Sequence, residues 1–483
     1  FYGTIIEVFG NFDDNIGLTN YFINYFNLST EFSEKVLKKS EKTLIRYYSE
    51  KEDEHKKRKD LRRLRTVTID PAGARDLDDA ITIMKHDVGY KLYVHIADVS
   101  YFVLKDNSID IETIKRSFSV YLPNQVIRML PPILSENLCS LLPYTDKYAV
   151  TTEINLNKFG NLISYEIYKS VIKSDYKFSY EEVYDILEGK KTFYDEGIVN
   201  DLFCLKELSE KLERERLKMP EVRFNQGVEL YNSDYSHRMI EEAMILNNII
   251  SATELNKRGL KYPSRYHPKP LEEYSKGILD NLSLINERNI NISINSIQSL
   301  FDSDNFNLKA YNFQMTQRLL TKAKYCNTNE GHWALNLNFY SHFTSPIRRV
   351  PDIISHRLIF GQKYEDSEMD KILKKCNENE FKYQKIDFLT EKFKRIRYIK
   401  NSNMLGSLFD AIVTDVRNPT ITLFVPDLFL THDMHVSDFS SDKLNYENNE
   451  FTGSINLKVN QWYKLKLNKI ILSMLELRFT IAK

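Results

Sequence analysis

The sequence is poor in cysteine, in tryptophan and in long apolar runs, and each scarcity narrows the kinds of protein it can encode. Its four cysteines are scattered with no CxxC or CxxH spacing, which argues against a zinc site or a disulfide framework and favours a reducing compartment. No apolar stretch is long enough to span a bilayer. The 67 Lys and Arg residues balance 67 Asp and Glu residues, so a polyanionic partner would have to meet local clusters of positive charge.

The pattern along the chain predicts an α+β fold followed by a small barrel. A length of 483 residues corresponds to roughly three domains. Short β-rich runs dominate residues 66–103 and amphipathic helical runs follow over 179–259, an order that favours an α+β domain over a regular βαβ array. From about Leu408 the chain returns to short strands. That pattern suits a closed barrel of the OB type, a common holder of single-stranded nucleic acid.

Two features of the composition bear on nucleic acid. The charged run EKEDEHKKRKDLRRLR, at residues 50–65, predicts either a solvated helix face or linker, or a contact to phosphates. The 30 Tyr and 28 Phe residues belong mostly to the core, although some could serve as platforms on which bases stack.

Four aspartates crowd into TIDPAGARDLDDAI, Thr68 to Ile81: Asp70, Asp76, Asp78 and Asp79. Asp70 ends a predicted strand, and Pro71 and Gly73 let the backbone fold back sharply, which would bring the other three carboxylates near it. Like charges this close need cations to neutralise them, and carboxylate oxygen is the ligand that Mg²⁺ prefers. Two such ions about 4 Å apart can hydrolyse a phosphodiester. A solvated acidic turn is the plainer alternative, whereas the D-x-D-x-D-G spacing of a calcium loop is absent.

A second segment, HWALNLNFYSHFTSPIRRVPDIISHR from His332 to Arg357, supplies positive charge. The part that follows the paired arginines predicts a helix with Pro351 in its first turn. The TSPIRR stretch would then lie at the positive end of that helix, where a phosphate is welcome. An arginine there presents a planar, permanently charged fork to phosphate oxygens and can stabilise charge that builds in a transition state.

Together these two segments resemble the signature pair of the RNase II/RNase R family of exoribonucleases, the RNB superfamily. Supporting stretches in matching order include VHIADVSYFV, SVYLPNQVIRMLP and HRMIEEAMILNN. The resemblance implies an RNB catalytic domain over residues 65–399 and a C-terminal OB-fold RNA-binding domain over 405–483. Residues 1–15 would be the remnant of an N-terminal cold-shock-type OB fold that is otherwise missing, and 16–64 a connecting segment.

The resemblance also implies an activity, which is processive 3′→5′ hydrolysis of single-stranded RNA to 5′-mononucleotides by a two-metal mechanism. Mg²⁺ would be the cofactor, with Mn²⁺ as a substitute. The family's metal ligands fall on Asp70, Asp76, Asp78 and Asp79. Asp78 is the one we expect to be least dispensable. The catalytic arginine falls on Arg348, with Arg349 as an auxiliary.

The RNA-binding positions implied by the resemblance are Tyr121, Tyr180, Phe224, Glu241, Thr344 and Ser345. Aromatic faces grip any base, at ~1–3 kcal/mol each. A carboxylate at Glu241 that accepts a ribose 2′-hydroxyl would distinguish RNA from DNA. The alternative for each aromatic is a place in the core, and for Glu241 a place on a helix surface.

Three positions depart from the family pattern. Val350 stands where an aromatic is usual, Trp333 replaces a Tyr or Phe, and the NQW at 460–462 replaces a glycine. None of them removes a metal ligand.

Two rival functions stand beside this reading: an RNA-binding relative that no longer cleaves, and a DNA-directed or endonucleolytic metal enzyme. The intact aspartates and Arg348 argue against the first. We expect single-stranded RNA as the partner, a monomer with no membrane attachment, and a cytoplasmic location, with an organelle as the alternative. The residues name no helicase or RNA-decay complex.

Overall fold

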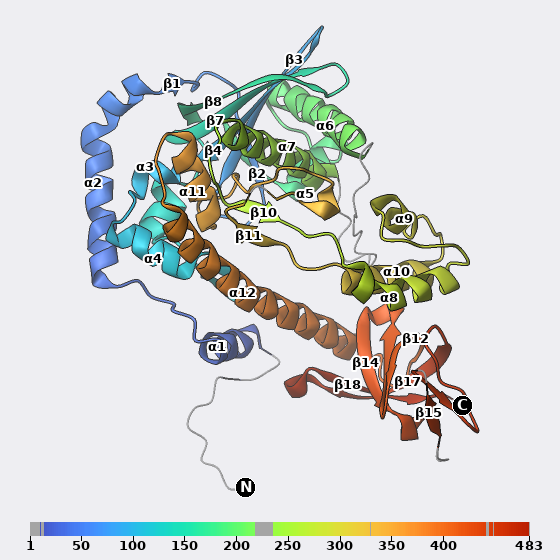
Figure 1. Cartoon of the computed structure of the whole chain (residues 1–483). Helices are drawn as coiled ribbons and strands as arrows, with labels where there is room; N and C mark the ends of the chain where they lie inside the picture. Colours follow the sequence, from blue (N-terminus) through green and yellow to red (C-terminus); the bar gives the residue numbers. More distant parts are fainter. Residues whose placement is uncertain are drawn as a thin grey trace.

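The computed structural model describes residues 10, 14–217, 235–328, 330–440, 444–447 and 449–482. Its larger part is built on a seven-stranded mixed sheet with helices around it, and its smaller part is a five-stranded antiparallel sheet of the OB type. One long helix, α12 (Asp366–Asn401), runs from the larger part to the smaller (Figure 1). The predicted α+β fold with a C-terminal barrel is confirmed. Most of residues 1–15 lie outside the described ranges, and the predicted domain bounds stay predictions.

The large sheet has the strand order β1-β8-β7-β4-β3-β2-β9. Its inner neighbours pair antiparallel, whereas the edge strands β1 and β9 pair in parallel with β8 and β2. The bounds are β1 Lys59–Asp60, β2 Val67–Asp70, β3 Asp79–His86, β4 Gly89–Ala97, β7 Asp146–Asn157, β8 Leu162–Lys173 and β9 Tyr176–Ser179.

The central strand β4 marks the core of the larger part. Every residue of β4 except Lys91 is buried. A strand covered on both faces reads as a nearly continuous apolar run, which explains the sequence GYKLYVHIA. The covering elements include α7, which contacts β4, and α6, which contacts the neighbouring β3.

Two helix boundaries lie where the sequence predicts them, the end of α7 and the start of α11. Gly259 follows α7 with a φ of +66°, a left-handed conformation that costs glycine little. Pro351 lies in the first turn of α11.

Besides α12, the α-helices of the described residues are α1 Asn15–Tyr25, α2 Glu34–Lys57, α3 Val99–Phe102, α4 Ser108–Arg116, α5 Tyr180–Leu187, α6 Glu196–Leu217, α7 Tyr235–Lys257, α8 Glu272–Ile285, α9 Ile294–Ser299, α10 Phe306–Leu319 and α11 Val350–Ile359. The short hairpin of β5 Val120–Tyr121 and β6 Val126–Ile127 forms one two-stranded sheet. Strands β10 Ser264–Tyr266 and β11 Lys324–Cys326, which are far apart in the sequence, pair antiparallel in another.

The C-terminal sheet has the strand order β14-β13-β12-β17-β18. Its bounds are β12 Leu408–Arg417, β13 Thr420–Val425, β14 Leu430–His435, β17 Trp462–Ile471 and β18 Glu476–Ile481, with a separate hairpin of β15 Asn445–Glu447 and β16 Glu450–Thr452. The start at Leu408 matches the predicted one.

Helices α8 and α10 dock onto the barrel through a shared apolar cluster. Asn460 reinforces the contact, since its side chain accepts a hydrogen bond from the Tyr311 hydroxyl and donates one to the Asn281 carbonyl at 3.0 Å. Asn460 has a φ of +71°, a conformation that asparagine tolerates better than most residues. Asn460, the first residue of the NQW stretch, thus adopts a left-handed conformation and anchors α8 and α10 to the barrel.

The charged run at residues 50–65 is largely a set of internal ion pairs. The Arg58 side chain is fully buried, 2.7 Å from Asp98 and 2.8 Å from Glu54. Arg62 pairs with Asp60 and Asp146, and Arg65 pairs with Asp201. Arg58 is therefore committed to the fold, whereas the Lys56 and Lys57 side chains beside it are more than 70% exposed. A contact between this run and phosphates stays a prediction.

None of the helices in the described part of the chain is both long and apolar enough to cross a membrane. The four cysteines, Cys139, Cys204, Cys326 and Cys376, are free thiols.

Candidate active site

The stretch from Asp70 to Asp79, which we call the acidic loop, connects two strands that lie side by side in the large sheet. Asp70 is the last residue of β2, and Asp79 is the first residue of β3. Between them, the Ala74 N–H donates to the Pro71 carbonyl at 2.9 Å, which closes the sharp turn predicted there. The carboxylates at the two ends of the loop therefore start from adjacent strands, as the sequence predicts.

Side chains from other elements fasten the loop. The Ser140 hydroxyl donates to the Arg75 carbonyl at 2.7 Å and accepts from the Leu77 N–H at 3.1 Å. Lys177, on β9, donates to the Ala74 carbonyl. A loop held by its main chain presents its carboxylates in a fixed arrangement, which is what a preorganised site requires.

Asp78 of the acidic loop contacts the segment that carries the paired arginines, His332 to Arg357, which we call the arginine segment. Its partner there, Ile347, lies 269 residues further along the chain. Asp78 is only 5% exposed. Its Oδ1 accepts from the Ile347 N–H at 2.8 Å, and its Oδ2 lies 3.5 Å from Arg348 Nε. Burial raises the pKa of Asp78 to about 8, while the Arg348 guanidinium and the Ile347 N–H oppose the shift. The two signature segments thus form one site.

Asp70 and Asp79 are also held in surroundings that disfavour their charge. Burial raises the pKa of Asp70 to about 7, with Lys177 opposing the shift and Asp76 adding to it. Burial also raises the pKa of Asp79 well above its ordinary value, and the Asp70 and Asp78 carboxylates add to the effect. A bound cation would relieve this repulsion.

The residues fit a magnesium site in donor type. Carboxylate oxygens are the ligands that Mg²⁺ prefers, and Asp70 Oδ2 is buried with no hydrogen-bond partner among the described residues. In the same part of the chain, no three His, Cys, Asp or Glu side chains lie close enough together to hold a metal ion as they stand. An ion would therefore have to draw the carboxylates of the loop closer together.

The two arginines have different surroundings. Arg348 is 42% exposed, and its Nη2 donates to Ser345 Oγ at 2.8 Å, so the guanidinium is oriented yet accessible. Arg349 is 17% exposed and donates to Asp352 Oδ1 at 2.8 Å. Asp352 Oδ1 also accepts from the Ser345 N–H at 2.7 Å. Arg348 can therefore meet a phosphate, whereas Arg349 braces the loop that carries it.

Thr344 and Ser345 are each only 4% exposed. Both were predicted to bind RNA. In this structure the Ser345 hydroxyl is occupied by Arg348, so its visible task is to orient that arginine. Their contact with RNA stays a prediction.

Two predicted stacking tyrosines flank the acidic loop. The Tyr121 hydroxyl, on β5, lies 3.3 Å from Asp76 Oδ2, and the residue is 47% exposed. Burial raises the pKa of Tyr180, and the charges of Asp79 and Asp70 add to the shift. The Tyr121 hydroxyl therefore contacts the acidic loop, and Tyr180 lies close enough to Asp79 and Asp70 to be affected by their charges.

The other two predicted RNA contacts are less informative. Glu241 is an exposed residue of α7, and Phe224 lies outside the described residues. Glu242, the residue after Glu241, is buried and pairs with Arg216. Glu241 and Phe224 stay predictions.

The sequence reasoning missed His237, whose ring stacks on Tyr180 with centroids 3.8 Å apart and planes 16° apart. His237 precedes Glu241 by four residues on α7, one turn away on the same helix face. That spacing is the signal by which it could have been found.

Comparisons with known proteins agree with this geometry. Residues 58–364 match the RNB domain family. Ribonuclease R of Aquifex aeolicus is 34% identical over 451 residues, which cover 86% of this chain and 62% of that protein. Mycoplasma genitalium RNase R in complex with ribose methylated single-stranded RNA has a TM-score of 0.86 at 25% identity, covering 98% of this chain and 79% of that one. The yeast pseudonuclease Ssd1 has a TM-score of 0.70 at 17% identity, covering 89% and 57%, which is a likeness of fold alone.

The chain spans 62% of the length of the Aquifex aeolicus protein. The matched family segment takes up well over half of this chain and contains both the acidic loop and the arginine segment. On that match, and on the meeting of the two segments at Asp78, the chain belongs to the RNB domain family.

Proposed function

We propose that this chain is a 3′→5′ exoribonuclease that hydrolyses single-stranded RNA processively to nucleoside 5′-monophosphates. The observation that carries the proposal is the contact between buried Asp78 and the accessible Arg348. It joins a cluster of carboxylates to a guanidinium, the two charge types that phosphodiester hydrolysis uses. The relatives named Ribonuclease R and the RNA-bound neighbour support RNA as the substrate.

Asp70, Asp76, Asp78 and Asp79 would hold two Mg²⁺ ions. When bound, such ions activate an attacking water and stabilise the charge that builds on the departing oxygen. The attack forms a new P–O bond and breaks the P–O3′ bond, so that the shortened RNA gains a 3′-hydroxyl and a 5′-mononucleotide leaves. Mn²⁺ could take the place of Mg²⁺ because it accepts the same oxygen ligands.

The remaining side chains would position the RNA end. Arg348, oriented by Ser345, would hold the scissile phosphate through its planar fork. Tyr121 and Tyr180 would stack on the terminal bases, with His237 behind Tyr180 fixing the plane of its ring. Glu241 would accept the terminal ribose hydroxyl.

The first test is analysis of the products from a 5′-end-labelled single-stranded RNA with Mg²⁺ and with a chelator. We expect stepwise shortening from the 3′ end and release of 5′-mononucleotides with Mg²⁺, and no hydrolysis with the chelator. A matching DNA strand and an RNA with a 3′-phosphate should be poor substrates. Internal cuts, or equal digestion of all three, would contradict the proposal.

The rival function is RNA binding without cleavage. It would appear in the same assay as RNA that is bound and stays intact with either Mg²⁺ or Mn²⁺. All four aspartates and Arg348 are present, and like charges held this close together are costly to retain without a use. The monomeric state and the cytoplasmic location stay predictions.

A further inference from the structure

One face of α12 carries an alternating series of basic and aromatic side chains. Side chains three and four positions apart share a helix face, and at that spacing α12 presents Lys374, Asn377, Phe381, Lys385, Phe388 and Lys392. The series extends over ~27 Å at the rise of an α-helix. Phe381 is 63% exposed and Phe388 is 66% exposed. Two open phenylalanines in one line are more than the isolated exposed apolar residue that needs no explanation.

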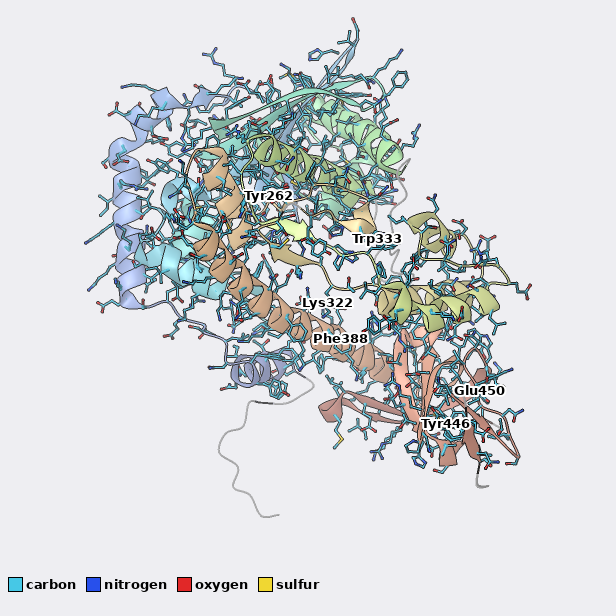
Figure 2. All side chains as sticks on the ribbon, viewed as in Figure 1. Tyr262, Lys322, Trp333, Phe388, Tyr446 and Glu450 are labelled. Carbon is cyan, nitrogen blue, oxygen red and sulfur yellow. The ribbon has the colours of Figure 1, made fainter. Side chains whose placement is uncertain are left out.

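A second chain segment adds a cation to this face. Lys322, in the connection between α10 and β11, places its ammonium 5.1 Å from the centre of the Phe381 ring. Figure 2 shows Lys322 and Phe388 on the side of α12 that is turned toward α8 and α10 in that view. We call Lys322, Phe381, Lys385, Phe388 and Lys392 the α12 strip.

The charge of the strip is unevenly opposed. From Phe381 to Asn401 the helix carries seven Lys or Arg residues and two Asp or Glu residues. The two acids, Asp387 and Glu391, lie roughly 100° around the helix from the strip. Lys385 and Lys392 have no hydrogen bond or ion pair with the described part of the chain. The strip is therefore a positively charged line with aromatic faces between the charges.

The Phe381 end of the strip lies next to residues of α12 that connect to the arginine segment of the candidate site. There α12 and β11 border a cavity of about 350 Å³, whose lining includes Lys324, Lys374 and Asn377 together with the acids Asp370 and Glu378. Asn377 exchanges two 2.8 Å hydrogen bonds with the backbone of Tyr325, whose hydroxyl bonds His342 at 2.7 Å. His342 precedes Arg348 by six residues.

The Lys392 end of the strip lies next to the barrel. Arg395, one helical turn beyond Lys392, donates to the Phe429 carbonyl at 2.7 Å, and Phe429 packs on Phe313 of α10 with ring centres 5.1 Å apart. The strip thus lies between the arginine segment and the barrel.

We propose that the α12 strip binds the single-stranded stretch of RNA that lies upstream of the terminal nucleotides. Phe381 and Phe388 stack on bases, and Lys322, Lys385 and Lys392 contact phosphates. Alternating cations and aromatic faces match a strand of alternating phosphates and bases, whereas protein interfaces are depleted in lysine. The inference rests on the proposed function in taking RNA as the ligand of this chain.

The test compares a long and a short RNA. The double variant Phe381→Ala/Phe388→Ala should weaken binding of an RNA of about 25 nucleotides at least ~10-fold, because each stacked base contributes ~1–3 kcal/mol. Hydrolysis of an RNA of about five nucleotides, which is too short to reach the strip, should be unchanged. Tyr398→Ala is the matched control, since Tyr398 is an aromatic on the same helix that is 52% exposed and lies roughly 100° away from the strip.

The lysines give a second measurement. Lys385→Gln and Lys392→Gln should each reduce the slope of log K against log salt for the long RNA by about 0.7. Lys394→Gln is the control, because Lys394 pairs with Glu391 on another side of the helix. Unchanged slopes together with unchanged affinity in the phenylalanine variant would overturn the proposal.

Binding is measured in chelator and hydrolysis in Mg²⁺, so that the two proposals fail separately. If the wild type degrades RNA while the strip variants bind the long RNA normally, the strip is wrong and the exonuclease stands. If the wild type binds RNA through the strip and releases no nucleotide, the strip stands and the exonuclease is wrong. Equal loss with long and short RNA, or a change in oligomeric state, would also contradict the strip.

Discussion

The carboxylates of this protein lie in two kinds of surroundings with opposite electrostatics. Glu207 on α6 accepts hydrogen bonds from Lys211, Lys85 and the Tyr90 hydroxyl at 2.5–2.7 Å, and these donors lower the pKa of Glu207 to about 2. In the acidic loop, burial instead raises the pKa of Asp78 to about 8. The same chemical group is readily ionised in one region and held against ionisation in the other.

The difference lies in the source of the compensating charge. Buried Asp98 has Arg58 at 2.7 Å, and buried Asp110 has Arg357 at 2.7 Å. In the acidic loop, the Asp78–Arg348 contact is longer, at 3.5 Å, and Arg348 is 42% exposed. A chain that pairs its buried acids closely in other places, yet sets Asp78 in a loop with three further aspartates and so little opposing charge, leaves that loop to an external cation.

The largest effect is expected from Asp78→Asn, which removes the charge and keeps the shape. The amide oxygen can still accept from the Ile347 N–H, so the loop should keep its fold. Nucleotide release should fall by about 10³-fold or more, because a metal ligand acts on every turnover. Single-turnover release and RNA binding, measured on the same preparation, check the prediction, and binding should change little.

The matched control for that variant is Glu207→Gln. It makes the same change from carboxylate to amide on a residue whose partners are the protein's own lysines. Turnover should stay at the wild-type level. Normal turnover of Asp78→Asn as well would place the chemistry outside the acidic loop.

The next effect separates the two arginines. Arg348→Lys keeps a positive charge but loses the planar fork, and the maximal rate should fall on the order of 10²-fold, the loss typical of one transition-state donor. Arg349→Lys should instead lower the thermal midpoint, since Arg349 braces Asp352. Rates and melting curves of both variants check the prediction. It fails if Arg349→Lys loses the larger share of the rate.

The local part of the site could be predicted from the sequence because its residues are neighbours in the chain. The four aspartates, the turn at Pro71 and the helix that begins with Val350 and Pro351 depend on interactions within a few residues. Local propensity and turn chemistry decide such features, and these are readable without a fold.

The remaining features depend on contacts between distant segments. Ser140 fastens the acidic loop from about 65 residues away, and the burial of Arg58 depends on Asp98. No pattern near Arg58 distinguishes it from the solvated lysines beside it. Helix α12 had a readable signal, since Met369, Ile372 and Leu373 recur at helical spacing. The exposure of Phe388, however, depends on what the other elements leave uncovered.

A smaller effect is expected when Mg²⁺ is added to the purified chain. An ion that binds only the folded state stabilises it by about 2.7 kcal/mol at 100 times its dissociation constant. The thermal midpoint of the wild type should therefore rise by a few degrees in MgCl₂ relative to NaCl of equal ionic strength. Asp70→Asn should lose most of that rise and Glu207→Gln none of it. Equal rises in all three proteins would mean that Mg²⁺ does not act through the acidic loop.

The smallest effect concerns the lysine-paired carboxylate. Because the pKa of Glu207 is lowered from 4.5 to about 2, its contribution to stability is present above pH 4.5 and is lost as the pH falls toward 2. Glu207 is 39% exposed, so solvent screening limits the contribution to about 1 kcal/mol or less. Urea midpoints of wild type and Glu207→Gln should differ at pH 6 and converge as the pH drops below 4.5. A gap that widens in acid would mean that Glu207 is not held ionised by Lys85 and Lys211, and the contrast with the acidic loop would lose its reference.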